Sequence, residues 1–314
     1  MNGVEKSSSL MIEREHKGIW QEKVKGFITD LVLLTKRIVL IANVLPVLTG
    51  FLLALHFSGG AFRDYWDVFL LTMIGSAFTI AGSLILNNWY EVDLDEKMAR
   101  TQLRPTVTGN IPMNVVLWLG IISSIIGLGM MLFTTIEAAI YAFLGWFTYV
   151  VLYTFWSKRK YTLNTVIGSV SGAFTPLIGW AAIDSAYHIV PIVLFIILFI
   201  WQIPHTFAIT MRRYHEYKAA GVPMLPVVYG FDMTKRQTVI YIVCLLPLPL
   251  FLTSLGTAFT VIAMLLTIGW TIVGFRGFFM EDNMKWAKMI YFYSLAYLMI
   301  LFTLMIIVTL PIFN

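Results

Sequence analysis

The chain has 314 residues, of which 59% are hydrophobic and only 12% charged, and its mean hydropathy is +0.80. These values exclude a water-soluble globular protein, because a surface in water needs many more charged groups. The net charge of +5 is weak evidence for a nucleic-acid partner, since basic residues beside lipid headgroups account for it. The single cysteine, Cys244, excludes an intramolecular disulfide and a cysteine metal site.

Residues 1–26 are polar, carry both signs of charge and contain no apolar core that could serve as a cleaved signal. They are also rich in Glu, whereas a mitochondrial transit peptide would be poor in acids. We therefore expect residues 1–27 to form a flexible cytoplasmic leader and residues 28–314 to form a single transmembrane domain. A bacterial inner membrane is the simplest location for such a chain.

Apolar runs of about twenty residues, each able to cross the roughly 30 Å hydrocarbon layer, recur along the rest of the chain. They predict an all-α, polytopic membrane protein with about nine transmembrane helices. The expected ranges are 33–56, 67–87, 113–133, 135–155, 163–183, 187–209, 237–256, 257–278 and 288–312. The block 237–278 is nearly continuous and is divided only by the sequence TSLGTA.

Basic residues indicate which end of this bundle faces the cytoplasm. If successive connections alternate between the two sides, all 22 Lys and Arg residues except Arg63 fall on the side of the N-terminal segment. Positive residues concentrate on the cytoplasmic side of a membrane protein. We therefore expect the N-terminus in the cytoplasm and the C-terminus outside.

Two connections on the basic side, 88–112 and 210–236, are longer than the others and end in segments with Gly and Pro. Four of the expected helices separate them, which suggests a weak four-helix repeat. Such a repeat would bring both connections together over one central cavity. Between them, GSVSG places Gly168 and Gly172 four residues apart in an apolar helix, a spacing that favours close helix packing.

The first connection begins with NNWYEVDLDEKMARTQLRP, residues 87–105. Asn87, Glu91 and Asp95 are spaced i, i+4, i+8, so a helix continuing from the membrane would present them on one face, with Asp93 off that face. Such hard oxygen ligands suit an Mg²⁺ ion that shares its other positions with phosphate oxygens. Basic side chains suited to phosphate follow at Lys97, Arg100 and Arg104. A solvated helix with surface ion pairs accounts for the same pattern, so the spacing alone leaves both interpretations open.

In the second connection and the helix before it, His205, Arg212 and Glu216 are spaced i, i+7, i+11, again on one helical face. His205 falls inside an expected membrane span, where an ionisable residue needs a cavity or a partner. Such a His can ligate a metal, including haem iron, or relay protons. A hydrogen-bonded packing His is an equally open interpretation.

A third basic cluster, Lys158, Arg159 and Lys160, lies between the fourth and fifth expected helices on the same side. Such a run is mostly a signal of membrane topology. Nearby, Tyr153 and Trp156 are expected in the aromatic belt at the membrane surface.

Taken together, these segments resemble the UbiA superfamily of intramembrane prenyltransferases over about residues 28–310. The superfamily pattern N-x-x-x-D-x-x-x-D falls on Asn87, Glu91 and Asp95, with Glu91 where Asp is more usual. The pattern M-x-R-T-x-x-R-P follows it in full at 98–105.

Other segments are similar to one branch of that superfamily, the protohaem IX farnesyltransferases or haem O synthases. The tract W-Q-x-P-H falls on 201–205, and TPLIGWAA at 175–182 resembles P-P-L-I-G-W-A. Glu216 and Tyr217 stand before A-G-V-P-M-L-P where the branch usually has Asp-Tyr. Because this second motif offers a single carboxylate, the number of bound Mg²⁺ ions stays open.

The resemblance implies a helical bundle around a central cavity in which farnesyl diphosphate ionises and a vinyl group of haem B attacks the farnesyl cation. Water then captures the product cation to give haem O, for haem A/O-type respiratory oxidases. Mg²⁺ is the expected cofactor, with Asn87, Glu91, Asp95 and Glu216 as ligands and Asp93 in support. The expected diphosphate-binding residues are Arg100, Arg104, Lys158, Arg159 and Arg212. His205 is the expected haem contact, as an iron ligand or against the porphyrin.

Two other functions remain compatible with the sequence. A related enzyme that prenylates a quinone precursor or a chlorin differs only in the acceptor, and a secondary transporter would also suit a four-helix repeat with an intramembrane His. Against the transporter, few ionisable residues stand near the middle of the membrane. The expected partners are farnesyl diphosphate, haem B and the lipid bilayer, with no nucleic acid. Whether a haem A synthase docks here stays open.

Overall fold

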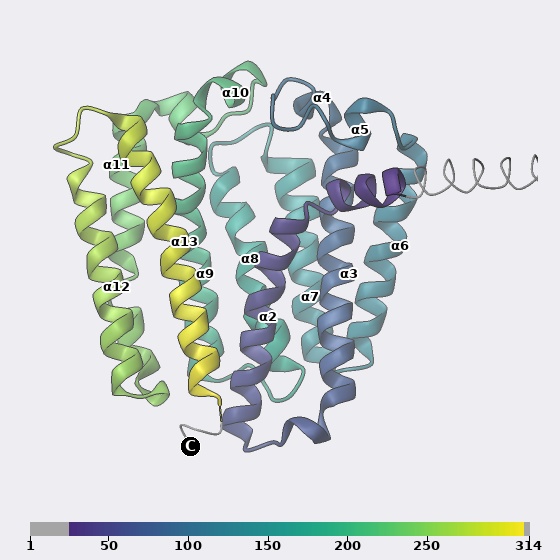
Figure 1. Ribbon diagram of the computed structural model, residues 1–314, viewed down its shortest axis with the longest axis vertical. Coiled ribbons are helices and arrows are strands. Elements are labelled where there is room, and N and C mark those ends of the chain that lie inside the picture. Colours follow the sequence, from purple (N-terminus) through teal and green to yellow (C-terminus); the bar gives the residue numbers. More distant parts are fainter. Residues whose placement is uncertain (1–24, 311–314) are drawn as a thin grey trace, which may run out of the picture.

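The computed structural model describes residues 25–310, and within that range it is all-helical (Figure 1). After a helical segment at 25–34, the elements are α2 (Arg37–Ser58), η1 (Phe62–Asp64), α3 (Trp66–Tyr90), α4 (Val92–Asp95), α5 (Pro105–Thr108), α6 (Met113–Leu132), α7 (Ile136–Phe147), η2 (Thr148–Ser157), α8 (Asn164–Ala181), α9 (Ile189–Arg212), α10 (Tyr214–Ala219), α11 (Leu225–Cys244), η3 (Leu248–Leu255), α12 (Thr257–Arg276) and α13 (Asn283–Val308). The leader expected at 1–27 lies almost entirely outside the described residues.

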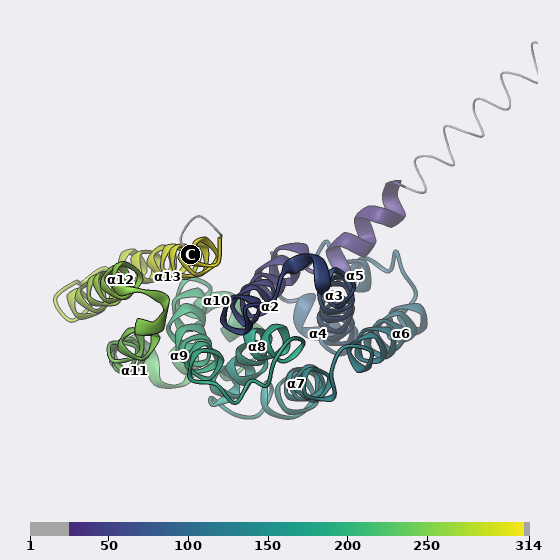
Figure 2. The same ribbon diagram turned by 90° about the horizontal axis from the view of Figure 1, so that it is seen from below.

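Eight of these helical stretches are long and apolar enough to cross a membrane within the described range. They match eight of the nine expected ranges, and the remaining range corresponds to α8. α8 has 18 residues, and its Gly, Ser and Thr residues make it less apolar than its neighbours. It nevertheless runs beside α2, α7 and α9 in the middle of the bundle (Figure 2). The prediction of an all-helical, polytopic membrane protein is confirmed.

Small residues let the central helices approach closely. A Cβ atom on Gly50 of α2 would lie 2.1 Å from the Pro176 carbonyl oxygen of α8, and one on Gly179 of α8 would lie 1.9 Å from the Val47 carbonyl oxygen. No side chain fits at those positions, so these glycines set the α2–α8 distance. The GSVSG segment acts similarly, because a Cβ atom on Gly172 would meet the Gln202 side chain at 2.5 Å.

The start of the first span differs from the expected one at residue 33. The segment 25–34 is a separate helix that runs in a different direction from α3 and projects from the edge of the bundle (Figures 1 and 2). Lys36 then has a left-handed backbone, φ 47° and ψ 55°, before α2 begins at Arg37. A lysine rarely adopts this conformation, so the surrounding contacts must favour it. The break turns the Lys36 side chain toward the end of α3.

The block 237–278 also differs in detail. α11 begins earlier than expected, at Leu225, and is kinked at Gly230 (φ 78°), a conformation that glycine adopts readily. The division at TSLGTA is confirmed, since η3 ends at Leu255 and α12 starts at Thr257 after Gly256.

The two long connections meet at one end of the bundle. α4 and α5 belong to the first and α10 to the second, and all lie at the top of Figure 1. Leu94 and Met98 of the first pack in one buried cluster with Tyr217, Val222 and Met224 of the second. We call this the basic end of the bundle, because Lys and Arg side chains gather there, among them Lys36, Arg104, Lys158 and Arg212. The expectation that both connections come together is therefore confirmed.

Candidate functional site

One cavity at the basic end, which we call the acidic cavity, is lined by Asn87, Glu91 and Asp95. Asn87 lies in the last turn of α3, Glu91 ends that helix with φ −102° and ψ 16°, and Asp95 ends α4. The Glu91 N–H still donates to the Asn87 carbonyl at 3.0 Å, and the Asp95 N–H to the Glu91 carbonyl at 2.9 Å. The predicted convergence is therefore present, although the helix is broken at Glu91.

Asn87 and Glu91 each contact a lysine. Lys36 Nζ donates to Asn87 Oδ1 at 2.5 Å, and Lys158 Nζ to Glu91 Oε2 at 2.5 Å. Burial works to lower the pKa of Lys158, but the Glu91 carboxylate together with the neighbouring Tyr153 and Tyr217 raises that pKa above its ordinary value. Burial and then the Arg104 charge hold the pKa of Lys36 well below its ordinary value. Lys158 is thus a fixed cation, whereas Lys36 loses its proton more readily.

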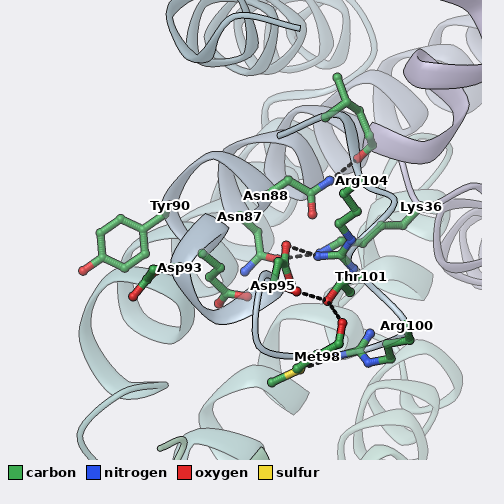
Figure 3. A network of polar contacts seen from close by, with 12 residues as sticks. Lys36, Asn87, Asn88, Tyr90, Asp93, Asp95, Met98, Arg100, Thr101 and Arg104 are labelled. Atoms are coloured by element: carbon green, nitrogen blue, oxygen red, sulfur yellow. Dashed lines mark hydrogen bonds and ion pairs between the residues drawn. The ribbon is translucent and has the colours of Figure 1, made fainter. Parts of the chain in front are cut away.

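Asp95 is buried and forms an ion pair with Arg104 (Figure 3). The turn between them is held by Thr101, whose hydroxyl donates to the Asp95 carbonyl oxygen at 2.7 Å. Pro105 then starts α5 directly after Arg104. This tight turn therefore brings the Arg104 guanidinium back to the Asp95 carboxylate.

This donor set fits an Mg²⁺ ion held together with a diphosphate. Glu91 Oε1 is buried and accepts no hydrogen bond from the described residues, so one carboxylate oxygen is available. Mg²⁺ usually binds through one or two carboxylates and completes its shell with waters and substrate phosphates. No group of three or more His, Cys, Asp or Glu side chains gathers anywhere in residues 25–310. The acidic cavity is therefore suited to a metal that arrives with its substrate.

Asp93 and Arg159 form a pair that does not line the acidic cavity. Both terminal nitrogens of Arg159 donate to the Asp93 carboxylate at 2.7 Å, and one also donates to the Tyr90 carbonyl at 2.9 Å. The hydrogen bond from Arg159 lowers the pKa of Asp93, and the same contact raises the pKa of Arg159. Figure 3 shows Asp93 and Tyr90 on the side of the α3 end away from Arg104. This pair can support the site only indirectly.

The π-helix η2 provides another wall of the acidic cavity. Tyr149 and Tyr153 line it, and the Thr154 hydroxyl accepts a hydrogen bond from Asn87 Nδ2 at 3.0 Å. The expectation that Tyr153 belongs to a surface aromatic belt is wrong, because its half-buried side chain faces this cavity. Short π-helical stretches are frequent at functional sites.

A second cavity lies deeper in the bundle, and we call it the inner cavity. Val39, Leu84 and Tyr149 line both cavities, so the two adjoin. The remaining walls of the inner cavity come from α2, α3, α7, α8 and α9. They consist mainly of small or apolar side chains, together with Trp146 and Gln202. A polar chamber therefore lies next to a less polar one between the helices.

Glu216 lines a third cavity. We call it the basic cavity because of its lining residues Arg100, Arg212, Arg213 and Lys288. Arg213 donates to Glu216 Oε1 at 2.7 Å, and Arg100 Nε lies 3.8 Å from Glu216 Oε2. The predicted metal ligands therefore do not gather at one point: Glu216 is apart from the others. Arg212, predicted as a diphosphate ligand, also lies in the basic cavity, whereas Arg100 and Tyr217 line both cavities.

His205 is half-buried in α9 between two aromatic rings, with ring centroids 4.8 Å from Trp201 and 5.3 Å from Tyr291. Its Nδ1 atom lies 2.7 Å from the Ser294 hydroxyl oxygen. That hydroxyl donates its proton to the Tyr291 carbonyl at 2.6 Å, so its oxygen accepts from Nδ1–H. This chain of hydrogen bonds places the proton on Nδ1. Nε2 has no hydrogen-bond partner among the described residues, which leaves its lone pair for a ligand.

Sequence reasoning did not identify Lys36, Tyr149, Arg213 or Lys288. Lys36 had one available signal, since the pair Lys36–Arg37 interrupts the apolar run at its start. The other residues lie in turns or spans with no distinguishing spacing. Their role follows only from contacts between distant segments, such as the 51 residues that separate Lys36 from Asn87.

Comparison with known proteins agrees with this architecture. Residues 43–310 match the UbiA prenyltransferase family. The chain is 54% identical over 295 residues to the protoheme IX farnesyltransferase of Oceanobacillus iheyensis, covering 94% of each protein. It is 51% identical over 281 residues to protoheme IX farnesyltransferase 2 of Bacillus subtilis, covering 90% of this chain and 92% of that protein.

Solved structures share the fold at low sequence identity. A digeranylgeranylglyceryl phosphate synthase superposes with a TM-score of 0.72 at 20% identity, covering 92% of this chain and 99% of the other. A UbiA homolog from Archaeoglobus fulgidus bound to GPP and Mg²⁺ superposes with a TM-score of 0.64 at 14% identity, covering 86% and 99%.

Proposed function

Because this chain belongs to the UbiA prenyltransferase family, we propose that it transfers the farnesyl group of farnesyl diphosphate to a vinyl group of protohaem IX. Water adds in the same reaction, and the products are haem O and diphosphate. Family membership removes the secondary transporter as an alternative. The acceptor is inferred from the names of relatives that share about half of their residues with this chain over most of its length.

The observation that carries the proposal is the adjoining pair of cavities. The acidic cavity combines carboxylates with Lys36, Arg104 and Lys158, so it can accept both a metal ion and a diphosphate. The inner cavity adjoins it between the helices, where Val39, Leu84 and Tyr149 line both. A prenyl diphosphate has this same division into a charged head and an apolar tail.

In the reaction, the allylic C–O bond of farnesyl diphosphate breaks and its electron pair leaves with the diphosphate. Mg²⁺ bound with the diphosphate would supply further stabilisation of that leaving charge, and Asn87, Glu91 and Asp95 would hold the ion. Lys158, Arg104 and Lys36 offer N–H donors to the diphosphate oxygens, and Arg100 reaches the same cavity. Because these donors are positioned before the reaction, they stabilise the developing charge without reorganisation.

The new carbon–carbon bond forms when the vinyl π electrons attack C1 of the farnesyl cation. This leaves a cation on the porphyrin side chain, which water captures with loss of a proton. Until then the allylic cation must be kept from water, and the wall of Tyr149, Leu84 and Val39 does so at the junction of the two cavities. The Asp93–Arg159 pair holds the ends of α3 and η2 together behind this site.

His205 is our candidate for the haem side. Its Nε2 lone pair is directed by the Nδ1–H hydrogen bond to Ser294, an arrangement usual for metal-ligating histidines. We also propose that the basic end faces the cytoplasm of a bacterial cell membrane, as the positive residues predict. We further propose that a haem A synthase consumes the haem O product and contacts this protein.

The direct test is to incubate the full-length protein in detergent with haem B, farnesyl diphosphate and Mg²⁺, with and without EDTA. We expect mass spectrometry of the extracted porphyrins to show a product heavier by one farnesyl group plus water, and we expect EDTA to prevent its formation. Haem B recovered unchanged, together with prenylation of an aromatic quinone precursor, would assign a different acceptor. A product that forms equally well with EDTA would remove the metal from the proposal.

A further inference from the structure

The basic cavity has more positive charge than its carboxylate can balance. Glu216 accepts a hydrogen bond from Arg213 at 2.7 Å and lies 3.8 Å from Arg100, so it is shared between two guanidinium groups. Arg212 and Lys288 also line the cavity, and within residues 25–310 neither forms an ion pair with a carboxylate. Cations that converge on a cavity without counter-charges indicate an anionic ligand.

The other lining groups suit an aromatic ligand. Tyr291 lines the cavity and carries the Arg212 guanidinium 4.4 Å above its ring. Ile209 and Met284 add apolar surface beside it. On its other side Tyr291 stacks against His205, at 5.3 Å between ring centroids. The cavity therefore combines free cations with flat and apolar walls, and it adjoins the histidine proposed for the haem.

We propose that the basic cavity binds the two propionate carboxylates of the porphyrin substrate, with Arg212 and Lys288 as their main partners. This inference rests on the proposed function and names the part of the protein that recognises the acceptor. A guanidinium can hold a carboxylate through two parallel hydrogen bonds, and a lysine adds a mobile cation. Two free cations match a ligand with two carboxylates.

The position of the basic cavity means that binding of the propionates also orients the porphyrin for the reaction. Arg100 and Tyr217 line both the basic and the acidic cavity, so the two chambers share a wall. On protohaem IX the vinyl groups stand on the edge of the macrocycle opposite the propionates. Holding the propionates therefore decides which edge of the porphyrin is presented to the farnesyl cation, and it discriminates against acceptors that lack carboxylates.

The test compares haem B with its dimethyl ester, in which both carboxylates are blocked. Binding of each to the full-length protein in detergent is followed by the shift of the Soret band, for the wild type and for Lys288→Met, Lys288→Glu and Arg212→Gln. Lys285→Met is the matched control, because Lys285 is exposed on the same helix and does not line the cavity. Binding of farnesyl diphosphate is measured in parallel.

We expect the wild type to bind the ester at least about tenfold more weakly than haem B, as the loss of a charge-assisted hydrogen bond predicts. Lys288→Met and Arg212→Gln should each weaken haem B by about tenfold and leave the ester unchanged, and Lys288→Glu should weaken haem B further. Equal wild-type affinities for haem B and its ester would overturn this proposal while the farnesyl transfer itself stands. If the variants lost only farnesyl diphosphate, the cavity would belong to that substrate instead. If the wild type bound neither porphyrin, the proposed acceptor would fall as well.

Discussion

The acidic and the basic cavity share a wall but differ in how their charged side chains are paired. In the acidic cavity, Glu91 is paired with Lys158 and Asp95 with Arg104, and both carboxylates are buried. In the basic cavity, Glu216 is shared by two arginines, and Arg212 and Lys288 have no carboxylate partner among the described residues.

The difference shows what each cavity can accept. A chamber in which both carboxylates are ion-paired can exchange these pairs for a metal ion and a diphosphate together, because the metal and the diphosphate largely cancel each other's charge. A chamber with unmatched cations gains from an anion that arrives without a metal. The pairing of charges in the free protein therefore indicates which ligand each cavity suits: a metal-bound substrate in the acidic cavity and a carboxylate in the basic cavity.

The largest effect should follow from breaking the matched pair at Asp95. Asp95→Asn should lower the rate of farnesyl transfer by about 10²- to 10³-fold, as expected when a group that organises transition-state charge is lost. It also leaves Arg104, whose side chain is 13% exposed, without its partner, which costs up to about 3–5 kcal/mol of stability. Rates from extracted porphyrins and thermal unfolding in detergent measure the two effects.

A double variant separates these effects. Asp95→Asn with Arg104→Gln removes the unpaired charge, so stability should return while transfer stays low. Glu96→Gln is the control, since Glu96 is exposed beside Asp95 and does not line the cavity. Transfer within a few-fold of the wild type in Asp95→Asn would remove this carboxylate from the mechanism.

The next effect concerns the haem side, where His205 should matter for the acceptor alone. His205→Ala should weaken haem B binding by about 10- to 100-fold and leave farnesyl diphosphate binding unchanged, because its side chain does not line the acidic cavity. Soret titrations and isothermal calorimetry measure the two affinities. His215→Ala, which changes an exposed histidine, should match the wild type. Unchanged haem affinity in His205→Ala would exclude this residue as an iron ligand.

Lys36 offers a smaller effect that sharpens the charge comparison. Among residues 25–310 its ammonium has no carboxylate partner and donates to the neutral Asn87, so a diphosphate oxygen can bind it without breaking an ion pair. Lys36→Met should raise the KM for farnesyl diphosphate by about tenfold, the loss of one charge-assisted hydrogen bond. The exposed neighbour provides the control variant, Arg37→Gln. If KM stayed constant and only kcat fell, Lys36 would act on the chemistry and not on binding.

The sequence alone predicted the membrane spans and one group of residues in the site. Apolar runs set the helix ranges because a span must cross a layer of fixed thickness. The spacing of Asn87, Glu91 and Asp95 predicted their convergence because the i→i−4 hydrogen bonds continue through the break at Glu91. Glu216 lies beyond a similar break at Arg213 (φ −116°, ψ 28°), but its side chain lines the basic cavity, apart from those three residues. Spacing therefore predicts which residues share a face of one helical path, and not which residues of another path they meet.

Residues brought together by tertiary packing could not be predicted in this way. Lys36 reaches Asn87 only because the chain turns through a left-handed residue, and no periodicity signals that turn. Lys288 joins Arg212 because α13 packs against α9, a pairing that a single sequence does not reveal. Hydropathy describes how deep a residue lies in the membrane and says little about which helices are neighbours.

The smallest effect should come from the Asp93–Arg159 pair, which lines neither cavity. Asp93→Asn removes the partner of Arg159 at an exposed position, where such pairs contribute only about 0.2–1 kcal/mol. Transfer should fall by no more than about threefold, since the pair acts through the backbone at the end of α3.

Because Arg159 lowers the folded-state pKa of Asp93 below its ordinary 3.8, the pair stabilises the protein above that value and this contribution is lost as the pH falls through the folded pKa. Unfolding free energy in detergent measured from pH 6 downward should therefore decline slightly more for the wild type than for Asp93→Asn. A loss of transfer as large as that of Asp95→Asn would mean that Asp93 works inside the acidic cavity, and the division between paired charges that bind substrate and paired charges that only hold the fold would no longer apply.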